Sequence, residues 1–257
     1  MQLNDKKSNI IVITARAGSE GVIGKNFKDF YGKPLIYWSI KNAVRTSIWH
    51  RDLKIYVSTN CNYVKQVCIK HFPLNLEDGS IEIIDRPEEI SGPKSKNEEA
   101  LKHASDFYFK KNGYYPNIIF NLQPTSPIRR NGIINDVINI MEEYVECDSV
   151  FSTVKEKPFL WRMDSFEKLT PQYDFNDRKM RQDLLNTELF YKDCGSIYAV
   201  KSDVLYSKNN RIGEYPKMIV LDEIEAMQID SEDDFGLMEY VLSKKINCEK
   251  YKWMNVD

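Results

Sequence analysis

The stretch IIVITARAGSEGVIGKN, residues 10–26, joins a short apolar run to a loop rich in glycine and charge. The run IIVI is typical of a strand that is buried on both faces of a parallel sheet. The loop that follows carries three glycines together with Arg16, Glu20 and Lys25. Glycines just past a strand let backbone amides approach a phosphate closely, and a following helix adds its positive end. The stretch predicts an α/β fold with an anion site at the tip of its first strand; a solvated surface turn is the alternative.

Apolar runs and helix-like segments alternate along most of the chain. Strands are expected at residues 10–14, 53–58, 81–84, 117–122, 149–154, 195–201 and 218–222. Helices are expected at residues 34–46, 63–71, 96–111, 132–144 and 231–242. Short strands separated by helices of about 10–15 residues indicate βαβ units. We therefore expect an α/β fold with a mostly parallel sheet, flanked by helices and joined by right-handed crossovers.

The alternation stops after residue 154. Residues 155–193 are rich in charged and aromatic side chains and follow neither the helical nor the strand period. Long irregular segments inside a compact domain usually carry function or a partner contact. We interpret the chain as a single domain, residues 1–257, with an inserted arm at residues 155–193.

Composition excludes several classes of protein. The net charge is −2, so no overall field attracts nucleic acid or an anionic membrane. No apolar run approaches the roughly 20 residues of a membrane span, and the polar N-terminus does not resemble a secretion signal. Five cysteines without metal-ligand spacing and three scattered histidines argue against a His-based metal site or a hydrolytic triad. We expect reduced thiols in a cytoplasmic protein that binds neither nucleic acid nor membrane.

Two familiar phosphate-binding templates do not match the first loop. The glycines fall at positions 18, 21 and 24, which does not fit GxGxxG. The P-loop pattern GxxxxGK[ST] also fails, because the glycine spacing is one residue too long and Asn26 follows Lys25. What remains is A-R-x-G-S-x-G-x-x-x-K-N, with a fixed cation near each end.

This loop and several later motifs resemble the CMP-sialic acid synthetases, the acylneuraminate cytidylyltransferases. The matching pieces, in chain order, are ARAGSEGVIGKN, GKPL, VST, RPEEISG, LQPTSPIR, RQDL, GSIY and QIDSEDDF. The resemblance implies a Rossmann-like fold of the nucleotidyltransferase type with an inserted dimerisation arm. It also implies transfer of CMP from CTP to the anomeric hydroxyl of a nonulosonic, sialic-acid-like keto acid sugar, with release of pyrophosphate. The expected cofactor is Mg²⁺ (or Mn²⁺), and the expected assembly is a homodimer.

The resemblance also implies roles for individual residues. The implied catalytic residues are Lys25, Arg16 and Asp230. The implied nucleotide contacts are Ala15, Arg16, Gly18, Ser19, Lys25, Asn26, Arg86 and Asn97. The implied sugar contacts are Gln123, Thr125, Ser126, Arg178, Arg181 and Gln182. The implied metal ligand is Asp230, with Gln228 as a second candidate.

Elementary chemistry supports some of these roles. Lys25 can stabilise the charge that develops as the α-phosphate is attacked, and we expect it to be an exposed loop lysine that contributes little to stability. A guanidinium such as that of Arg181 matches a sugar carboxylate with two parallel hydrogen bonds. For Ser126 a helix cap is the alternative. Ser231 is expected to cap the last helix, with the acids at 232–234 in structural roles.

Three departures from the family pattern make this a divergent member. The lysine of the family's GSKG is Glu20 here, which places a carboxylate beside the expected polyanion. Residues 93–97 read PKSKN instead of a run of small hydroxyls, and Ser95 and Asn97 are the expected substitutes. Gln228 stands where many members have an acid.

Two other readings stay open. A CMP-Kdo-type synthetase, which uses an eight-carbon keto acid sugar, would share the fold and the chemistry. A nucleotide- or sugar-binding paralogue without catalysis would account for the three departures.

Overall fold

A seven-stranded sheet forms the centre of the computed structural model, which describes residues 8–18, 21–48, 50, 52–72 and 81–255. Its strand order is β11-β7-β10-β6-β1-β4-β5. The strands are β1 (Asn9–Thr14), β4 (Leu53–Thr59), β5 (Ile81–Asp85), β6 (Ile118–Leu122), β7 (Ser149–Glu156), β10 (Phe190–Lys201) and β11 (Pro216–Leu221). Only β10 runs antiparallel to its neighbours within this sheet. The predicted α/β fold with a mostly parallel sheet is confirmed.

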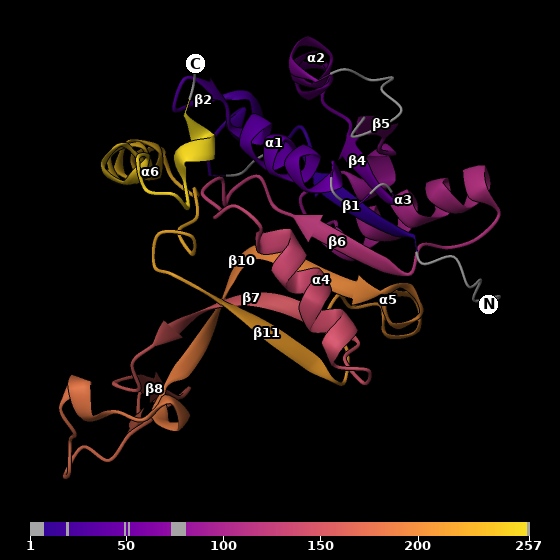
Figure 1. Cartoon of the computed structure of the whole chain (residues 1–257). Coiled ribbons are helices and arrows are strands. Elements are labelled where there is room, and N and C mark those ends of the chain that lie inside the picture. The colour runs from indigo at the N-terminus through magenta and orange to yellow at the C-terminus, as the bar shows by residue number, and fades with distance from the viewer. Residues whose placement is uncertain (1–7, 19–20, 49, 51, 73–80, 256–257) are drawn as a thin grey trace.

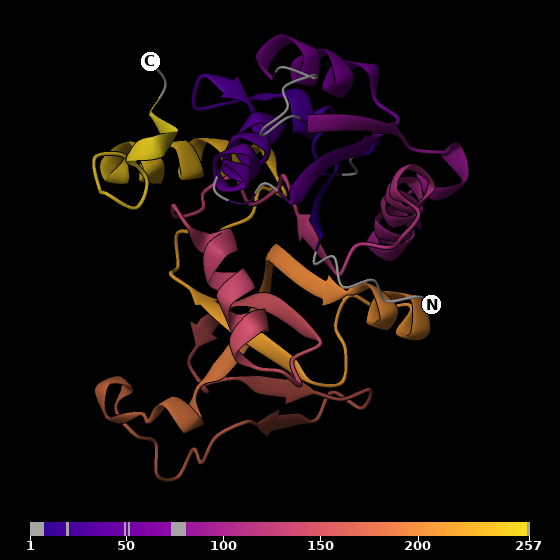
Figure 2. The same ribbon diagram turned by 45° about the vertical axis from the view of Figure 1, so that its right-hand side comes forward.

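Helices cover both faces of the sheet (Figures 1 and 2). On one face lie α1 (Leu35–Ser47), α2 (Asn62–His71) and α4 (Ile133–Glu143). On the other lie α3 (Asn97–Asn112) and α5 (Ser202–Lys208). The first strand shows why: Ile11 and Ile13 join the core under α1, while Ile10 and Val12 join the core under α3. Because successive side chains of a strand point to opposite faces, the run IIVI is buried on both sides.

The last helix, α6 (Glu232–Lys245), packs beside α1 instead of on the sheet. Trp38 of α1 contacts Trp253 of the short 3-10 helix η5 (Lys252–Met254), with ring centroids 6.3 Å apart. Phe235 and Met238 of α6 belong to the same buried cluster. This third cluster fixes the turn between β11 and α6 against the loop after β1.

The chain reverses its direction of travel across the sheet at β1. From β1 it passes through α1 to β4 and through α2 to β5, and α3 then returns along the opposite face to β6, on the other side of β1. The connection that follows β1 therefore leads to one side of β1, and the connection that precedes β6 leads to the other side. In open α/β sheets, ligands bind at such a switch point, outside the carboxyl ends of the strands.

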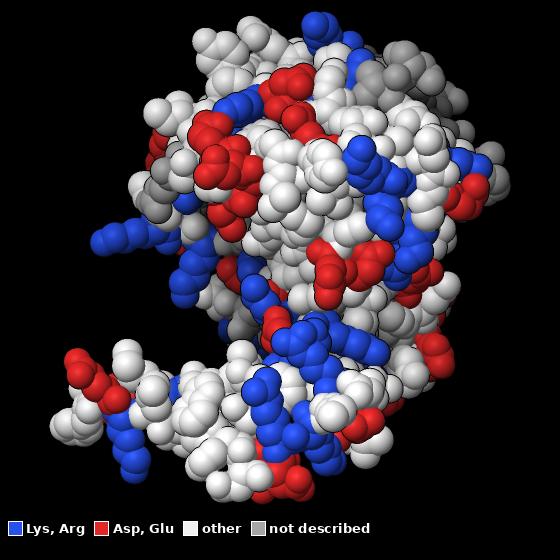
Figure 3. Space-filling view, turned by 90° about the vertical axis from the view of Figure 1, so that its left-hand side faces the viewer, with Lys and Arg blue, Asp and Glu red and all other residues white. Residues whose placement is uncertain are grey.

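Residues 155–193 project from the body as an arm (Figures 1 and 3). Its base is a ribbon in which β7 and β10 pair from Thr153 with Asp193 to Glu156 with Phe190. Beyond the ribbon lie a hairpin of β8 (Trp161–Met163) and β9 (Leu169–Pro171) and the 3-10 turns η3 (Arg181–Asp183) and η4 (Asn186–Glu188). Neither the hairpin nor these turns was predicted.

Other differences from the sequence prediction are local. The structure adds α5, the small hairpin of β2 (Asp29–Phe30) and β3 (Lys33–Pro34), and the 3-10 turn η1 (Lys25–Phe27). The predicted strand at 195–201 begins earlier, at Phe190, because its first residues extend into the arm. The alternative role of Ser126 as a helix cap is wrong, since α4 starts at Ile133 after Gly132. Over the described ranges, none of the helices has the length and apolar character needed to cross a bilayer.

Candidate active site

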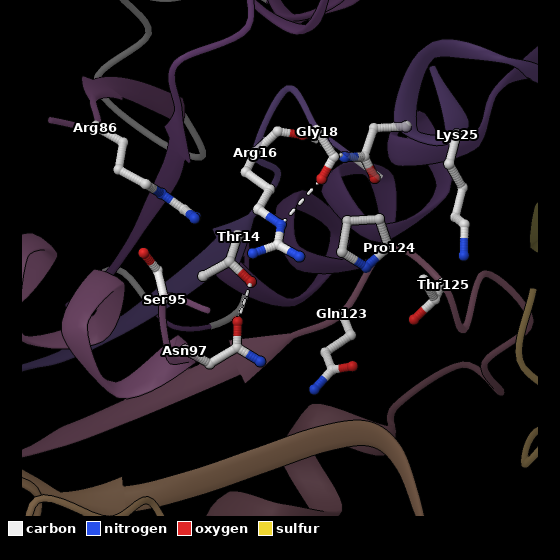
Figure 4. Close-up of a pocket in the computed structure, with 11 residues that line it drawn as sticks. Thr14, Arg16, Gly18, Lys25, Arg86, Ser95, Asn97, Gln123, Pro124 and Thr125 are labelled. Carbon is white, nitrogen blue, oxygen red and sulfur yellow. Dashed lines mark hydrogen bonds between the residues drawn. The ribbon is translucent and has the colours of Figure 1, made fainter. Parts of the chain in front are cut away.

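A cavity of about 300 Å³ opens at the carboxyl ends of β1, β5 and β6. Figure 4 shows that side chains from the first loop, from the end of β5, from the start of α3 and from the turn after β6 converge on it. Its lining residues are Thr14, Arg16, Gly18, Lys25, Asn26, Arg86, Ser95, Asn97, Gln123, Pro124 and Thr125. Six of the eight implied nucleotide contacts and two of the six implied sugar contacts are among them.

Arg16 is held in place by backbone carbonyls. Its Nε donates to the Gly18 carbonyl at 3.0 Å, and its Nη1 donates to the carbonyls of Gly92 and Pro93 at 2.5 and 3.0 Å. In the part of the chain that the structure describes, no carboxylate pairs with it. The guanidinium is therefore a positioned positive charge that remains available to an anion.

Arg86 is a second guanidinium on the same cavity. It is 7% exposed, and it donates from Nε to Ser58 Oγ at 3.1 Å and from Nη2 to the Ser58 carbonyl at 3.0 Å. Burial, and to a smaller extent the nearby charge of Arg16, lower the pKa of Arg86 to about 10. The group is still charged at neutral pH, so two like charges share one polar cavity. Such an arrangement fits a ligand with several negative charges.

Lys25 is more enclosed than the sequence suggested. Its side chain is 9% exposed; Nζ donates to the Ile229 carbonyl at 2.7 Å and lies 3.5 Å from Asp230 Oδ1. The loop can approach this closely because position 21 is glycine: a Cβ there would lie 2.2 Å from the Asp230 carbonyl oxygen. The expectation of an exposed loop lysine is wrong, because its partner lies in the turn before α6.

Polar side chains complete the wall of the cavity. Asn97, the first residue of α3, accepts a hydrogen bond from Thr14 Oγ1 at 3.4 Å. Asn26 Nδ2 donates to the Arg16 carbonyl at 3.3 Å. Ser95 also lines the cavity, so both expected substitutes in the PKSKN segment are in place. Thr14 was not predicted, although its position as the last residue of the first strand could have revealed it.

A buried arginine, Arg129, anchors the turn LQPTSPIR (residues 122–129) to neighbouring elements. Arg129 is fully buried and donates from Nη2 to the carbonyls of Gln123 and Ser196, both at 2.7 Å, and from Nη1 to Ser39 Oγ at 2.9 Å. Its burial lowers the pKa of the guanidinium to about 9. The sequence analysis missed this residue and Pro124. Its hydrogen bonds join the turn to Ser196 of β10, and Gln123 of the turn faces the cavity (Figure 4).

Several implied contacts lie away from the cavity. Ala15 is 1% exposed, and its N–H and carbonyl bond to Ser58 and Thr59. Ser126 is fully buried, with no hydrogen-bond partner for its Oγ among the described residues. Neither side chain faces the cavity in this conformation. Ser19 and the divergent Glu20 fall outside the described residues.

The three implied sugar contacts of the arm do not reach the cavity of their own chain. Arg178 lies over the ring of Phe159, with Cζ 4.3 Å from the centroid. Gln182 Nε2 donates to Met180 Sδ at 3.1 Å, and Arg181 is exposed. Figure 3 shows the arm set apart from the body, with lysines and arginines gathered around the recess between them.

A second cavity of about 510 Å³ adjoins the first across Gly195 and contains both candidate metal ligands. Among the described residues no group of three or more His, Cys, Asp and Glu side chains could hold a metal ion. The Asp230 side chain is 75% exposed and is an oxygen donor that fits Mg²⁺, an ion commonly held by one or two carboxylates and by substrate phosphates. Gln228 Nε2 donates to the Cys194 carbonyl. The residues present therefore fit an ion whose other ligands come from the substrate.

Two of the acids that follow Asp230, Glu232 and Asp234, make structural contacts, as predicted. Asp234 Oδ2 accepts hydrogen bonds from the N–H groups of Asp230 and Ser231 at 2.9 and 2.7 Å, which lower the pKa of Asp234. Ser231 is the N-cap of α6, as predicted. Glu232 pairs with Lys28.

Comparison with known proteins covers nearly the whole chain. A family model described as cytidylyltransferase matches residues 10–251. The N-acylneuraminate cytidylyltransferase of Escherichia coli O18:K1:H7 is 26% identical over 240 residues, which are 92% of this chain and 52% of that protein. This chain thus spans about half the length of that relative. The CMP-N,N'-diacetyllegionaminic acid synthase of Legionella pneumophila is 27% identical, over 91% of this chain and 95% of that protein.

Two further matches extend the comparison. The pseudaminic acid cytidylyltransferase of Campylobacter jejuni serotype O:23/36 is 24% identical, over 86% of this chain and 92% of that protein. Among solved structures, a CMP:2-keto-3-deoxy-manno-octonic acid synthetase complexed with CTP superimposes with a TM-score of 0.63 at 16% identity. That superposition covers 93% of this chain and 99% of the other. At such low identity the likeness concerns the fold alone.

Proposed function

Because the chain belongs to the cytidylyltransferase family, we propose that it transfers CMP from CTP to the anomeric hydroxyl of a nonulosonic, sialic-acid-like keto acid sugar, with release of pyrophosphate. The names of three relatives support this acceptor class, since they specify N-acylneuraminate, N,N'-diacetyllegionaminic acid and pseudaminic acid. The eight-carbon acceptor named for the structural neighbour is the alternative.

One observation carries the nucleotide half of the proposal. Arg16, Arg86 and Lys25 surround a single cavity, and the only carboxylate paired with any of them in the described chain is the exposed Asp230. Three positioned cations whose positive charge is so little neutralised by carboxylates favour a ligand with several negative charges, such as a triphosphate. The start of α3 adds backbone N–H groups and the positive end of a helix dipole.

The geometry suggests how these residues assist phosphoryl transfer. Attack on the α-phosphorus builds charge on its non-bridging oxygens and on the departing pyrophosphate. Lys25 Nζ, held by the Ile229 carbonyl, supplies a preorganised cation for that charge, and Arg16 neutralises the departing group. The acceptor hydroxyl then approaches from the side of Gln123 and Thr125. Catalysis on this account is mainly positioning and charge neutralisation.

A divalent cation, Mg²⁺ (or Mn²⁺), belongs to this proposal. It would neutralise phosphate charge and orient the pyrophosphate for departure. Asp230 is the residue to hold it, with Gln228 as a weaker neutral candidate. Both line the second cavity, and Asp230 also lies beside Lys25.

We extend the proposal to a homodimer in which the arm contributes to the partner's site. The arm exposes apolar side chains that its own chain leaves uncovered, among them Trp161, Phe166, Met180 and Leu185, which are 50, 89, 66 and 63% exposed. Exposed apolar groups on one element favour a protein contact. Such a contact would bring the sugar-side candidates of the arm to a neighbouring cavity. The cytoplasmic location and the absence of nucleic-acid partners stay predictions.

The decisive assay is CTP-dependent pyrophosphate release. Purified protein should release pyrophosphate with Mg²⁺ or Mn²⁺ and one member of a panel of sialic, legionaminic, pseudaminic and eight-carbon keto acids. Release only with the eight-carbon acid would select the alternative acceptor. If calorimetry shows CTP binding but no acceptor or metal gives turnover, the protein would be a nucleotide-binding paralogue without catalysis.

A mixing experiment tests the shared site. Lys25→Ala and Arg181→Ala chains, each with little turnover alone, are refolded together in equal amounts. Random pairing makes half of the dimers mixed, and each mixed dimer holds one intact site, so about a quarter of wild-type turnover should return. No recovery in mixtures shown to contain mixed dimers would exclude a contribution of the arm to the partner's site.

A further inference from the structure

Two segments meet beside the first cavity. One is the turn LQPTSPIR after β6, which Arg130 follows directly; the other is the connection of residues 222–231 between β11 and α6. The turn carries Thr125 on the wall of the cavity, and the connection carries Ile229, whose carbonyl accepts a hydrogen bond from Lys25 Nζ at 2.7 Å. The position of the Lys25 ammonium therefore depends on how the connection is fixed to the turn.

A buried carboxylate makes the first contact between the two segments. Glu225 of the connection is 1% exposed, and its Oε1 accepts hydrogen bonds from the backbone N–H of Arg130 at 2.8 Å and from Arg130 Nη1 at 3.2 Å. Its Oε2 accepts from the same Nη1 at 3.1 Å and from the backbone N–H of Asp222 at 3.3 Å. One carboxylate thus bonds to the residue that ends the turn and to the residue that begins the connection.

The second contact lies at the residue that holds Lys25. The Ile229 N–H donates to the Thr125 carbonyl at 2.8 Å, so the residue that accepts from the ammonium is itself bonded to the wall of the cavity. Hydrogen bonds in such a chain polarise one another. A shift of the connection at Glu225 would therefore move the Ile229 carbonyl, and the ammonium with it.

Stability alone does not explain why Glu225 is buried as an ion. Removal of both charges from water opposes their attraction, so an apolar pair of similar volume is often at least as stable. Arg130 has a second partner, Asp136 of α4, with Nη2 3.0 Å from Oδ2, but that carboxylate is 48% exposed and belongs to neither segment. The directional hydrogen bonds of Glu225 do what an apolar pair cannot, because they fix the connection relative to the turn.

We propose that Glu225 and Arg130 are positioning residues for Lys25, and that they act on the transfer reaction through the Ile229 carbonyl. This inference rests on the proposed function, which gives Lys25 its role at the attacked phosphate. The two arginines of the cavity are held by segments outside the turn and the connection. The pair should therefore affect the chemical step more than it affects CTP binding.

The test introduces Glu225→Ala into the wild-type chain and into Lys25→Ala. In the wild-type chain, kcat for pyrophosphate release should fall about 10- to 100-fold, because a small displacement of a reacting group is costly. The KM for CTP should change less than about twofold, as for an interaction made only in the transition state. In Lys25→Ala the same change should lower kcat by less than about twofold, since the group that Glu225 positions is gone.

Two further variants control for the chemistry of the pair. Glu225→Gln keeps an oxygen that accepts from the Arg130 N–H, so it should retain most of the turnover. Asp136→Asn removes the other carboxylate of the same arginine and should leave kcat unchanged, because an exposed pair contributes little.

A chemical measurement tests the same geometry without turnover. The protein without ligands is treated with trace acetic anhydride, and mass spectrometry compares the acetylation of Lys25 with that of Lys28, whose side chain is 39% exposed. In the wild type Lys25 should react more slowly, because its ammonium is held and is 9% exposed. In Glu225→Ala the rate at Lys25 relative to Lys28 should rise several-fold, and in Asp136→Asn it should not change.

Arg130→Met combined with Glu225→Leu covers the case in which Glu225→Ala does not fold. This apolar exchange should not lower the melting temperature, but it should lower kcat and expose Lys25 to acetylation in the same way. Failure of both variants to fold would assign the pair to the fold and overturn the proposal.

Equal losses of kcat from Glu225→Ala in the two backgrounds would also overturn the proposal, as would an unchanged acetylation ratio in a folded variant that lacks the pair. If no acceptor sugar supports pyrophosphate release, the proposed transfer reaction fails. The acetylation ratio would still decide whether the pair positions Lys25, so the two failures are distinguishable.

Discussion

The cavity at the end of β1 and the arm at residues 155–193 both carry arginines, but they hold them differently. In the cavity, Arg16 and Arg86 donate to carbonyls and hydroxyls of neighbouring elements. In the arm, Arg178 rests on Phe159 of the same arm and Arg181 is exposed. Cations fixed by the core are ready for a ligand, whereas cations on an exposed element need a second surface to define their position.

The two regions also differ in how apolar groups are used. Around the cavity, apolar side chains lie in the cores under the sheet. On the arm, Phe166 and Met180 face solvent. We therefore expect that the body binds a nucleotide by itself and that the arm acts only when a second protein covers its exposed apolar side chains.

The largest effect is expected from Lys25→Ala. Loss of a preorganised cation at the attacked phosphate should lower kcat by about 10²–10³-fold. Stability should also fall, by about 1–3 kcal/mol, because the Ile229 carbonyl loses a charged donor. Pyrophosphate release and thermal unfolding measure the two effects. Lys28→Ala is the control: Lys28 pairs with Glu232 outside the cavity, and its loss should leave kcat unchanged.

Replacing the arm by a short turn should separate the contribution of the arm from that of the body. Glu156 pairs directly with Phe190, so an Asn-Gly turn between them can close a hairpin in place of residues 157–189. The shortened protein should be monomeric by light scattering and should keep its stabilisation by CTP. Turnover should fall about 10²-fold, since the acceptor loses the groups that position it. A shortened chain with full turnover would mean that the body alone contains the whole site.

Arg86→Met tests whether the buried cation serves the ligand or the fold. CTP affinity should fall roughly 10- to 100-fold, the loss expected for a hydrogen bond to a charged group. The melting temperature without ligand should not decrease, because Arg86 is a buried cation with no carboxylate partner among the described residues, and such a cation costs stability. With its pKa near 10 the group stays charged across the neutral range, so the loss of affinity should not depend on pH there. A large drop in unliganded stability would reassign Arg86 to a structural role.

The smallest effect concerns two glycines. Gly195→Ala introduces a Cβ into a positive-φ residue against Gln228 and should destabilise the protein by about 1–3 kcal/mol. Gly18→Ala adds a Cβ with no described atom within 4 Å, so it should leave stability unchanged and weaken CTP binding only. Thermal unfolding with and without CTP distinguishes the two. Equal destabilisation by both changes would contradict this contrast.

The body was predictable because its signals are local. The run IIVI, the loop after it and the order of strands and helices specify elements whose ends differ from expectation by one or two residues in most cases. The cavity followed from motif positions at the ends of strands. The burial of Lys25 was not predictable in this way, because its partner Ile229 is 204 positions away along the chain.

The arm resisted prediction for a different physical reason. The strands β8 and β9 have three residues each and are largely exposed, so no face is buried and no alternating pattern develops. The first part of β10, residues 190–193, is likewise outside the core, which is why the predicted strand began only at Gly195. The periodicity of apolar residues reveals which side chains are buried in the chain's own core. The arm makes little contact with that core, so its strands show no such periodicity.

The 12-residue strand β10 belongs to both regions at once. Its first residues pair with β7 in the arm, and its last residues lie between β6 and β7 in the body. Between these parts lie Cys194 and Gly195, next to the wall that divides the two cavities. We therefore expect a tilt of the arm to move this peptide. If a second chain binds the arm, we expect this continuous strand to carry the resulting shift to the two cavities, and substrate saturation curves would then depend on protein concentration.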